Sequence, residues 1–397
     1  MAPSRPGPGS RTRPTGIRRP TRRAAPASLP LHPAARSATA PRARKAERPD
    51  DHHSPVPATP PRRVSRRTAL LLAGVLAVPL GGGVAAPAAA RVDAGDTPGV
   101  TCTGVPDGFA SVNALGQNGT TGGAGGPTVT VTTAAQLASA AGQAGPLNIR
   151  VSGRIQVSDM ITVVANKSII GVGATAEITG GGLQLGSTTR PGNNVIIRNI
   201  RFTDAEDDSI SVTNKAHHVW IDHNDLSDGY DGLLDIKRES DFVTVSWNRF
   251  HQHSKASLVG HSDNYPADRG KLRVTYHHNF FDGTDQRHPR VRFAEPVHIY
   301  NNYYRNNALY GIASTEDAGL MVEGNYFENV AHPIHVGYAD SAPGRVVERN
   351  NLYVGSGTPE TAGTVVEPRT YYPYTVDSPA SVPATVTAGV GVGRVCP

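Results

Sequence analysis

A recurring asparagine at the ends of short β-rich segments constrains the fold of this 397-residue chain more than any other feature. Each of these asparagines is followed within three positions by an aromatic or aliphatic residue, at intervals of 25, 24, 31, 23, 23 and 26 residues. The set comprises Asn199, Asn224, Asn248, Asn279, Asn302, Asn325 and Asn351. A period in the twenties without helices indicates a solenoid, and the leucine pattern of leucine-rich repeats is missing.

We therefore predict an all-β, right-handed parallel β-helix. Its stacked asparagines would form a buried ladder, because side-chain amides both donate and accept hydrogen bonds. A β-sandwich is the alternative, but it does not explain the recurring asparagine. Strand-like segments include residues 128–131, 148–151, 195–198, 243–247 and 272–276. Only residues 133–142, which end at Gly142, are expected to form a helix, so the solenoid has one short N-terminal helix.

Charge divides the chain into a basic leader and an acidic remainder. Residues 1–90 hold 16 of the 39 Lys and Arg residues and 3 of the 33 Asp and Glu residues. Residues 91–397 therefore keep 23 basic and 30 acidic residues, a net charge of −7, and we expect them to form a single catalytic domain. This excludes a basic nucleic-acid-binding protein. Residues 1–63, rich in Arg and Pro, are predicted to be a disordered basic extension.

Residues 64–90 have the order of an export signal. Arg66 and Arg67 precede an apolar run that ends at Leu80, and three alanines follow at 88–90. The paired arginines resemble a twin-arginine signal, and an ordinary secretory signal is the alternative. A start at Val64 would remove residues 1–63 from the protein. In each case we expect a secreted, extracellular protein with no membrane partner after signal cleavage.

The chain has two cysteines, Cys102 and Cys396, near the ends of the expected domain. In an oxidising compartment they either pair as a disulfide or remain two buried thiols.

Four ionisable residues keep nearly the same distance from the asparagine repeat. They are Asp208, Asp231, Lys255 and Arg287, which lie 9, 7, 7 and 8 residues after the preceding asparagine. Since adjacent strands are about 4.8 Å apart, we expect one vertical file of roughly 14 Å on one face of the β-helix. We call these four residues the charged column.

Further carboxylates extend the acidic end of the charged column. Asp235 follows Asp231 by four residues, and Gly232 between them allows a bend that would bring the two together. Three facing carboxylates would repel one another without a cation. Oxygen-only ligands in an irregular site favour Ca²⁺ over Mg²⁺, and Glu206 is close enough in sequence to be a fourth ligand.

The basic end holds Lys255, Arg287 and Arg292, with Pro289 fixing the backbone between the two arginines. Guanidinium groups match carboxylates and phosphates. Beside a cation site in an exported acidic protein, this cluster suggests an acidic sugar chain bridged by metal. The pairs His251/His253 and His277/His278 could chelate a transition metal, but no third ligand has a matching spacing. We therefore expect structural histidines.

Several segments in order carry a family resemblance. They are Gly108-Phe109-Ala110 with Thr121-Gly122-Gly123, residues 166–173 (NKSIIGVG), residues 219–223 (VWIDH), residues 231–237 (DGLLDIK), residues 243–248 (VTVSWN) and residues 287–292 (RHPRVR). Over most of residues 102–355 the chain resembles the pectate lyase superfamily, polysaccharide lyase family 1, and in particular secreted actinobacterial pectate lyases.

The resemblance implies a parallel β-helix with a calcium-dependent cleft. By motif, Asp208, Asp231 and Asp235 match the calcium-binding acids, Arg287 matches the catalytic base, and Lys255 and Arg292 match the binders of the substrate carboxylate. Some members have a pair of acids where this chain has Glu206-Asp207-Asp208, and either Glu206 or Asp207 takes the second role.

The implied reaction is β-elimination on α-1,4-linked polygalacturonate, which yields 4,5-unsaturated oligogalacturonides. A polygalacturonase, a pectin lyase and a non-catalytic glycan-binding β-helix are the alternatives. The first would use carboxylates and water without calcium, the second would act on esterified chains, and the third would leave polymer size unchanged. We expect a monomer that has no nucleic-acid partner.

Overall fold

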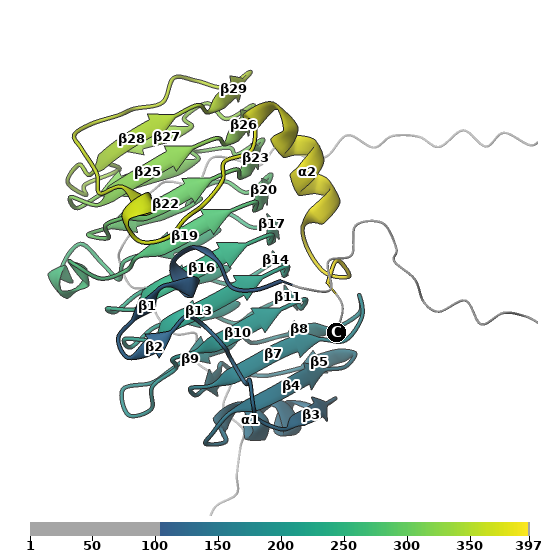
Figure 1. Cartoon of the computed structure of the whole chain (residues 1–397). Helices are drawn as coiled ribbons and strands as arrows, with labels where there is room; N and C mark the ends of the chain where they lie inside the picture. Colours follow the sequence, from purple (N-terminus) through teal and green to yellow (C-terminus); the bar gives the residue numbers. More distant parts are fainter. Residues whose placement is uncertain (1–103, 396–397) are drawn as a thin grey trace, which may run out of the picture. The chain divides into compact units, whose positions relative to one another are not determined.

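Residues 104–395, which the computed structural model describes, wind in repeated coils, most of which place one strand in each of three parallel sheets (Figure 1). The solenoid has about nine turns, and the predicted parallel β-helix is confirmed. The ten-stranded sheet contains β3 (Thr128–Val131), β4 (Leu147–Val151), β7 (Lys167–Gly171), β10 (Val195–Arg198), β13 (His217–Asp222), β16 (Asp241–Ser246), β19 (Val274–His277), β22 (Val297–Tyr300), β25 (Gly319–Glu323) and β28 (Arg345–Arg349).

The other two sheets complete each coil. The nine-stranded sheet contains β5 (Arg154–Gln156), β8 (Glu177–Thr179), β11 (Arg201–Thr203), β14 (Asp225–Ser227), β17 (Arg249–His251), β20 (Phe280–Asp282), β23 (Tyr303–Arg305), β26 (Tyr326–Glu328) and β29 (Leu352–Val354). The eight-stranded sheet contains β6 (Ile161–Val163), β9 (Leu183–Leu185), β12 (Ile210–Val212), β15 (Leu234–Ile236), β18 (Ser257–Val259), β21 (Arg290–Arg292), β24 (Ile312–Thr315) and β27 (Ile334–Val336). A separate antiparallel pair joins β1 (Asn113–Ala114) to β2 (Gln117–Asn118).

The interior of the solenoid is a continuous apolar core. Because side chains alternate between the two faces of a strand, β15 buries Leu234 and Ile236 in this core and turns Asp235 to the outer face. Parallel pairing sets Leu234 beside Ile210 on one neighbouring strand and beside Ser257 on the other. Outward residues of consecutive coils are therefore stacked in files.

A buried ladder of asparagines lines the bend between the ten-stranded and nine-stranded sheets. Asn248 Oδ1 accepts hydrogen bonds from the backbone N–H of Asn224 at 2.9 Å and from its Nδ2 at 3.0 Å. The same pair of bonds recurs between successive members of the set Asn248, Asn279, Asn302, Asn325 and Asn351. The ladder predicted from the repeat is confirmed from Asn224 onward.

The prediction is wrong for Asn199. Ile200, one residue later, occupies the ladder position, because its backbone N–H donates to Asn224 Oδ1 at 3.1 Å. Asn199 instead has a φ of 60° and takes the left-handed bend that precedes each rung, as His223 does before Asn224. Asparagine is among the few residues that tolerate this conformation, so it can mark either position.

The described part has two α-helices. The predicted helix is α1 (Ala134–Gly142), and the Thr133 side chain accepts from the N–H of Gln136 at its N-terminus. The second, α2 (Val382–Gly389), was not predicted and packs Val382 and Val386 against Phe280 and Tyr303. Neither helix is long and apolar enough to span a membrane. Short 3₁₀ helices are η1 (Gly108–Ser111), η2 (Pro266–Asp268), η3 (Pro368–Thr370) and η4 (Pro379–Ser381).

Several sequence predictions fall outside the described residues. They concern the basic extension 1–63, the export signal 64–90, and the pairing of Cys102 with Cys396.

Candidate active site

The charged column lies just before four neighbouring strands of one sheet. Asp208 precedes β12, Asp231 precedes β15, Lys255 precedes β18 and Arg287 precedes β21. Pairing holds the segments in register: the N–H of Asp231 donates to the carbonyl of Asp207, and Lys255 forms a parallel bridge with Gln286. The predicted vertical file of acids and bases is confirmed.

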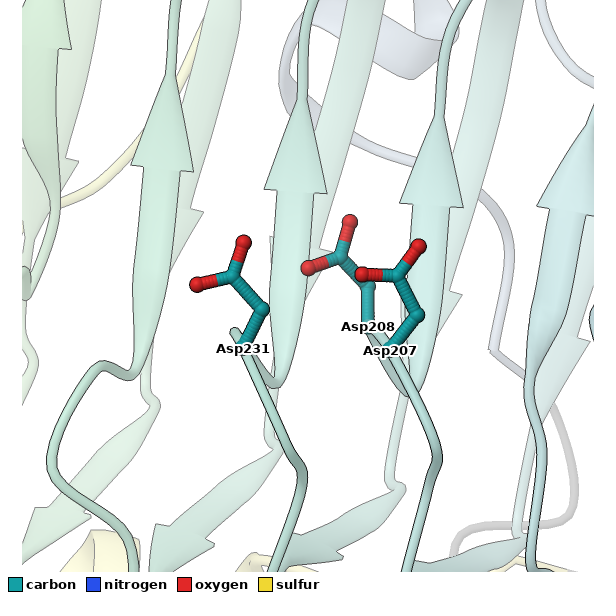
Figure 2. Close-up of side chains that lie close together, drawn as sticks. All are labelled: Asp207, Asp208 and Asp231. Carbon is teal, nitrogen blue, oxygen red and sulfur yellow. The ribbon is translucent and has the colours of Figure 1, made fainter. Parts of the chain in front are cut away.

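Three carboxylates gather at the acidic end of the charged column. Asp207, Asp208 and Asp231 each offer an oxygen, and these oxygens lie within 4.8 Å of one another. Figure 2 shows the side chains of two adjacent coils side by side, with their carboxylates pointing the same way. Oxygen donors at such spacing suit a hard divalent cation.

Of the two acids that the sequence left open, the structure brings Asp207 into this group. Glu206 instead lines a neighbouring open groove of about 640 Å³, together with Asp204, Asp228 and the exposed ring of Tyr230.

Lys237 is a member of the site whose place the sequence did not reveal. Its ammonium lies 2.7 Å from Asp208 Oδ2 and 3.2 Å from Asp235 Oδ2. Burial alone would lower the pKa of Lys237, but the two carboxylates raise it above its ordinary value. Asp235 is thus held beside Asp208, whereas the close group around Asp231 contains Asp207 and Asp208 and not Asp235. The other oxygen of Asp235, Oδ1, is buried and receives no hydrogen bond from any described residue.

Gly232 leaves space between these acids. A Cβ atom placed there would lie 2.9 Å from Asp235 Oδ1 and 3.0 Å from Asp208 Oδ1. Burial, reinforced by the charge of Asp235, raises the pKa of Asp208 to about 7, although Lys237 opposes the shift. The raised pKa means that Lys237 only partly offsets the repulsion between the buried carboxylates of Asp208 and Asp235.

The basic end begins at Lys255, whose ammonium lies 3.1 Å from Asp231 Oδ1. Burial would raise the pKa of Asp231, but the charges of Lys255 and Arg287 bring it below its ordinary value. Burial lowers the pKa of Arg292, and so do the charges of Arg290 and Arg287. Arg287 is therefore close enough to act electrostatically on both Asp231 and Arg292.

The loop that carries Arg287 is fixed from within. His288, its neighbour, is fully buried, and its Nδ1 lies 2.9 Å from the carbonyl oxygen of Tyr310. Because a carbonyl can only accept, Nδ1 carries the proton and Nε2 accepts from the Thr284 hydroxyl at 2.7 Å. Burial lowers the pKa of His288 to about 3, so this neutral arrangement persists.

The histidine pairs take structural roles, as expected. His251 Nε2 lies 2.9 Å from Asp225 Oδ1, and His253 Nε2 lies 3.0 Å from the carbonyl of Asp231. His277 and His278 are within hydrogen-bond distance of Asp107 and Asp377. Within residues 104–395, the acidic group is the one cluster of possible metal ligands found.

Comparison with known proteins identifies the family of this chain. A family model described as pectate lyase matches residues 67–371. The chain belongs to the pectate lyase family. The family expected from the motifs is therefore confirmed, and the protein is a polysaccharide lyase.

Individual pectate lyases match most of this family member. A pectate trisaccharide-lyase from Bacillus licheniformis is 37% identical over 311 residues, which cover 73% of this chain and 87% of that protein. A pectate trisaccharide-lyase from Thermotoga maritima is 35% identical over 341 residues, which cover 73% of this chain and 89% of that protein. The crystal structure of a pectate lyase from Bacillus sp. N165 with trigalacturonate has 32% identity and a TM-score of 0.65, and covers 73% of this chain and 99% of that chain.

Proposed function

We propose that this pectate lyase family member is secreted and cleaves polygalacturonate by calcium-dependent β-elimination. The observation that carries the proposal is the charged column, which brings acids and bases from four consecutive coils to one face. An acidic polysaccharide needs both, since its carboxylates can be bridged by a cation and bound by guanidinium and ammonium groups. The trigalacturonate in the related Bacillus sp. N165 structure supports the same substrate class.

Calcium would be held by Asp208, Asp231 and Asp235, with Asp207 rather than Glu206 as the additional acid. The residues fit such an ion: their ligand atoms are all oxygens, one buried carboxylate oxygen of Asp235 lacks a donor in the described part, and Gly232 keeps the space beside it open. When bound, the cation supplies Lewis-acid polarisation of the uronate carboxylate, which makes the adjacent C5–H more acidic.

The chain's own residues would perform the elimination. Lys255 and Arg292 bind the uronate carboxylate and stabilise the negative charge that grows on it. Arg287 takes the C5 proton, the electron pair of that C–H bond forms the C4=C5 double bond, and the C4–O bond breaks with its electrons on the departing oxygen. Protonation of that oxygen completes the new chain end. Arg287 must give up its own proton first, and the positive groups around it favour that loss.

The test is turnover of polygalacturonate by the wild-type protein, followed by ultraviolet absorbance of the conjugated product. We expect absorbance to rise with calcium, to stop when a chelator is added, and to resume with excess Ca²⁺ but less with Mg²⁺. New reducing ends without absorbance would indicate a hydrolase instead. Absorbance that is indifferent to the chelator would contradict the calcium site. Recovery of the protein from culture medium, with its N-terminus sequenced, tests secretion.

A further inference from the structure

The longest coil of the solenoid carries a loop that returns to the basic end of the charged column. Ladder residues Asn248 and Asn279 are 31 residues apart, whereas neighbouring rungs are separated by 23 to 26 residues. The extra residues lie between β18 and β19 and include η2. Asp268 is fully buried and accepts from the N–H groups of Glu239 and His261, which anchors the loop.

Asp263, in this loop, contacts Arg292 directly. Its Oδ1 accepts a hydrogen bond from Arg292 Nε, and its Oδ2 accepts from the Ser341 hydroxyl at 2.6 Å. Ser341 Oγ in turn accepts from Arg290 Nη2 at 2.7 Å. Ser341 belongs to the segment between β27 and β28, so the network ties β21 to two separate loops.

The hydrogen bonds of Asp263 and Ser341 lie where positive charge is concentrated at the basic end of the charged column. The side chains of Arg290 and Arg292 are almost entirely buried, and so is that of Arg287, which places three like charges in a region of little water. Burial would raise the pKa of Asp263, but hydrogen bonds from Ser341 and Arg292 lower it, so the carboxylate stays ionised. Asp263 is thus a fixed negative charge beside the arginines.

The contact also orients Arg292. Asp263 engages only the Nε edge of the guanidinium, and no hydrogen bond from Nη1 or Nη2 of Arg292 to another described residue is found. A guanidinium has five N–H donors in a planar fork, so fixing one edge leaves the terminal pair of nitrogens aimed in one direction. The N–H groups of that terminal pair can donate hydrogen bonds to a carboxylate.

We propose that Asp263, braced by Ser341, is a positioning residue that holds Arg292 in the orientation that binds the uronate carboxylate. The inference rests on the proposed function, because it needs Arg292 to bind substrate. Asp263 itself touches neither substrate nor cation. It acts through Arg292, so its loss weakens substrate binding more than it slows the chemical step.

The test is Asp263→Asn in the full-length protein, assayed on polygalacturonate at saturating calcium. We expect KM to rise roughly tenfold, the size of effect expected from weakening one hydrogen bond to a charged group. We expect kcat to stay within about twofold. Ser341→Ala should also raise KM, by roughly threefold, since it removes one hydrogen bond to Asp263 and leaves the carboxylate in place. Asp263→Glu should recover part of the affinity.

Asp317→Asn is the matched control. Asp317 pairs with Arg269 and Arg345 in the same part of the molecule, is more than half exposed, and does not contact Arg292. The Asp317→Asn substitution removes the same charge as Asp263→Asn but away from Arg292, so KM should stay within about twofold of wild type. An unchanged KM for Asp263→Asn would overturn the proposal. So would a rise shared by Asp317→Asn, or a fall in kcat with KM unchanged. A wild-type protein without lyase activity would instead refute the proposed function before any variant is compared.

Discussion

The asparagine ladder and the charged column are both files of polar side chains that repeat from coil to coil, yet they are built in opposite ways. Each central rung of the ladder is the same neutral residue, fully buried, and its amide bonds to the rungs on both sides. The column changes from acid to base over four coils and is partly open to solvent, with more than a third of the Asp231 side chain exposed.

The difference shows what each file is suited to do. The ladder satisfies its own hydrogen-bonding groups and so contributes to stability without any ligand. Acidic groups crowd one end of the column and basic groups lie at the other. A cation and a polyanion would complete it, and this is why we place function there.

The largest effect is expected at the basic end of the column. Arg287→Lys should lower kcat on polygalacturonate by about 10²–10⁴-fold, the range for loss of a general base, while KM changes little. Steady-state absorbance kinetics measure both quantities. Arg305→Lys, on the outer face of the nine-stranded sheet, is the control and should leave kcat unaltered. Turnover of Arg287→Lys near the wild-type value would remove Arg287 from the role of base.

A second test concerns the acidic end. Asp208→Asn should raise the calcium concentration needed for half-maximal activity by roughly 10–100-fold, because one ligand charge is lost. Calcium titration of the initial rate gives this value. Asp225→Asn removes a carboxylate that pairs with His251 on another sheet, and should leave the titration unchanged. Equal shifts in the two variants would mean that Asp208 acts only through general charge.

The ladder should respond in stability and not in chemistry. Asn279→Ala removes the acceptor for the N–H of Asn248 and the donor to the carbonyl of Val245. Each buried group left unpaired costs about 1–3 kcal/mol, so chemical denaturation should show a loss of several kcal/mol. Asn351→Ala, at the half-buried last rung, should cost less than half as much. A drop in kcat at temperatures where Asn279→Ala is folded would show that the ladder affects catalysis as well as stability.

The smallest effect concerns pH beside the ladder. His278 precedes Asn279 and stacks on Trp247, and burial together with His277 lowers its pKa to about 4, although Asp377 opposes the shift. The folded state therefore disfavours protonation. The contribution of neutral His278 to stability is complete above pH 6.5, the ordinary pKa of histidine, and is lost as pH falls toward 4.

Melting temperatures measured between pH 7 and pH 4.5 test this contribution. His278→Asn removes the titrating group and keeps a residue that tolerates the left-handed bend, so its melting temperature should fall less steeply with acid than that of wild type. The amides of the ladder do not titrate. Parallel acid profiles for wild type and His278→Asn would show that the histidine has no part in acid sensitivity.

Much of the fold could be predicted because the repeat is local in sequence. The predicted segments 128–131 and 195–198 coincide with β3 and β10, and α1 begins one residue after the predicted start at 133 and ends at the predicted Gly142. The helix α2 could not be predicted, since its short segment contains Pro383 and is held by packing against Phe280 and Tyr303. The one-residue error at Asn199 has a similar origin, because sequence alone does not separate a rung from the bend before it.

The site was predictable to the extent that coil spacing determines position. The file of Asp208, Asp231, Lys255 and Arg287 follows from the repeat, whereas the contacts across coils do not. Lys237 reaches Asp208 over 29 residues, and Asp263 reaches Arg292 over 29 residues and Ser341 over 78 residues. These pairs depend on the lengths of individual loops, which the average period does not specify.

A crystal structure of Arg287→Lys with Ca²⁺ and trigalacturonate would test the central claim most directly. We predict a cation bounded by Asp208, Asp231 and Asp235, and a uronate carboxylate within hydrogen-bond distance of Lys255 and Arg292. A cation or saccharide bound on another face, with the charged column unchanged, would contradict the account.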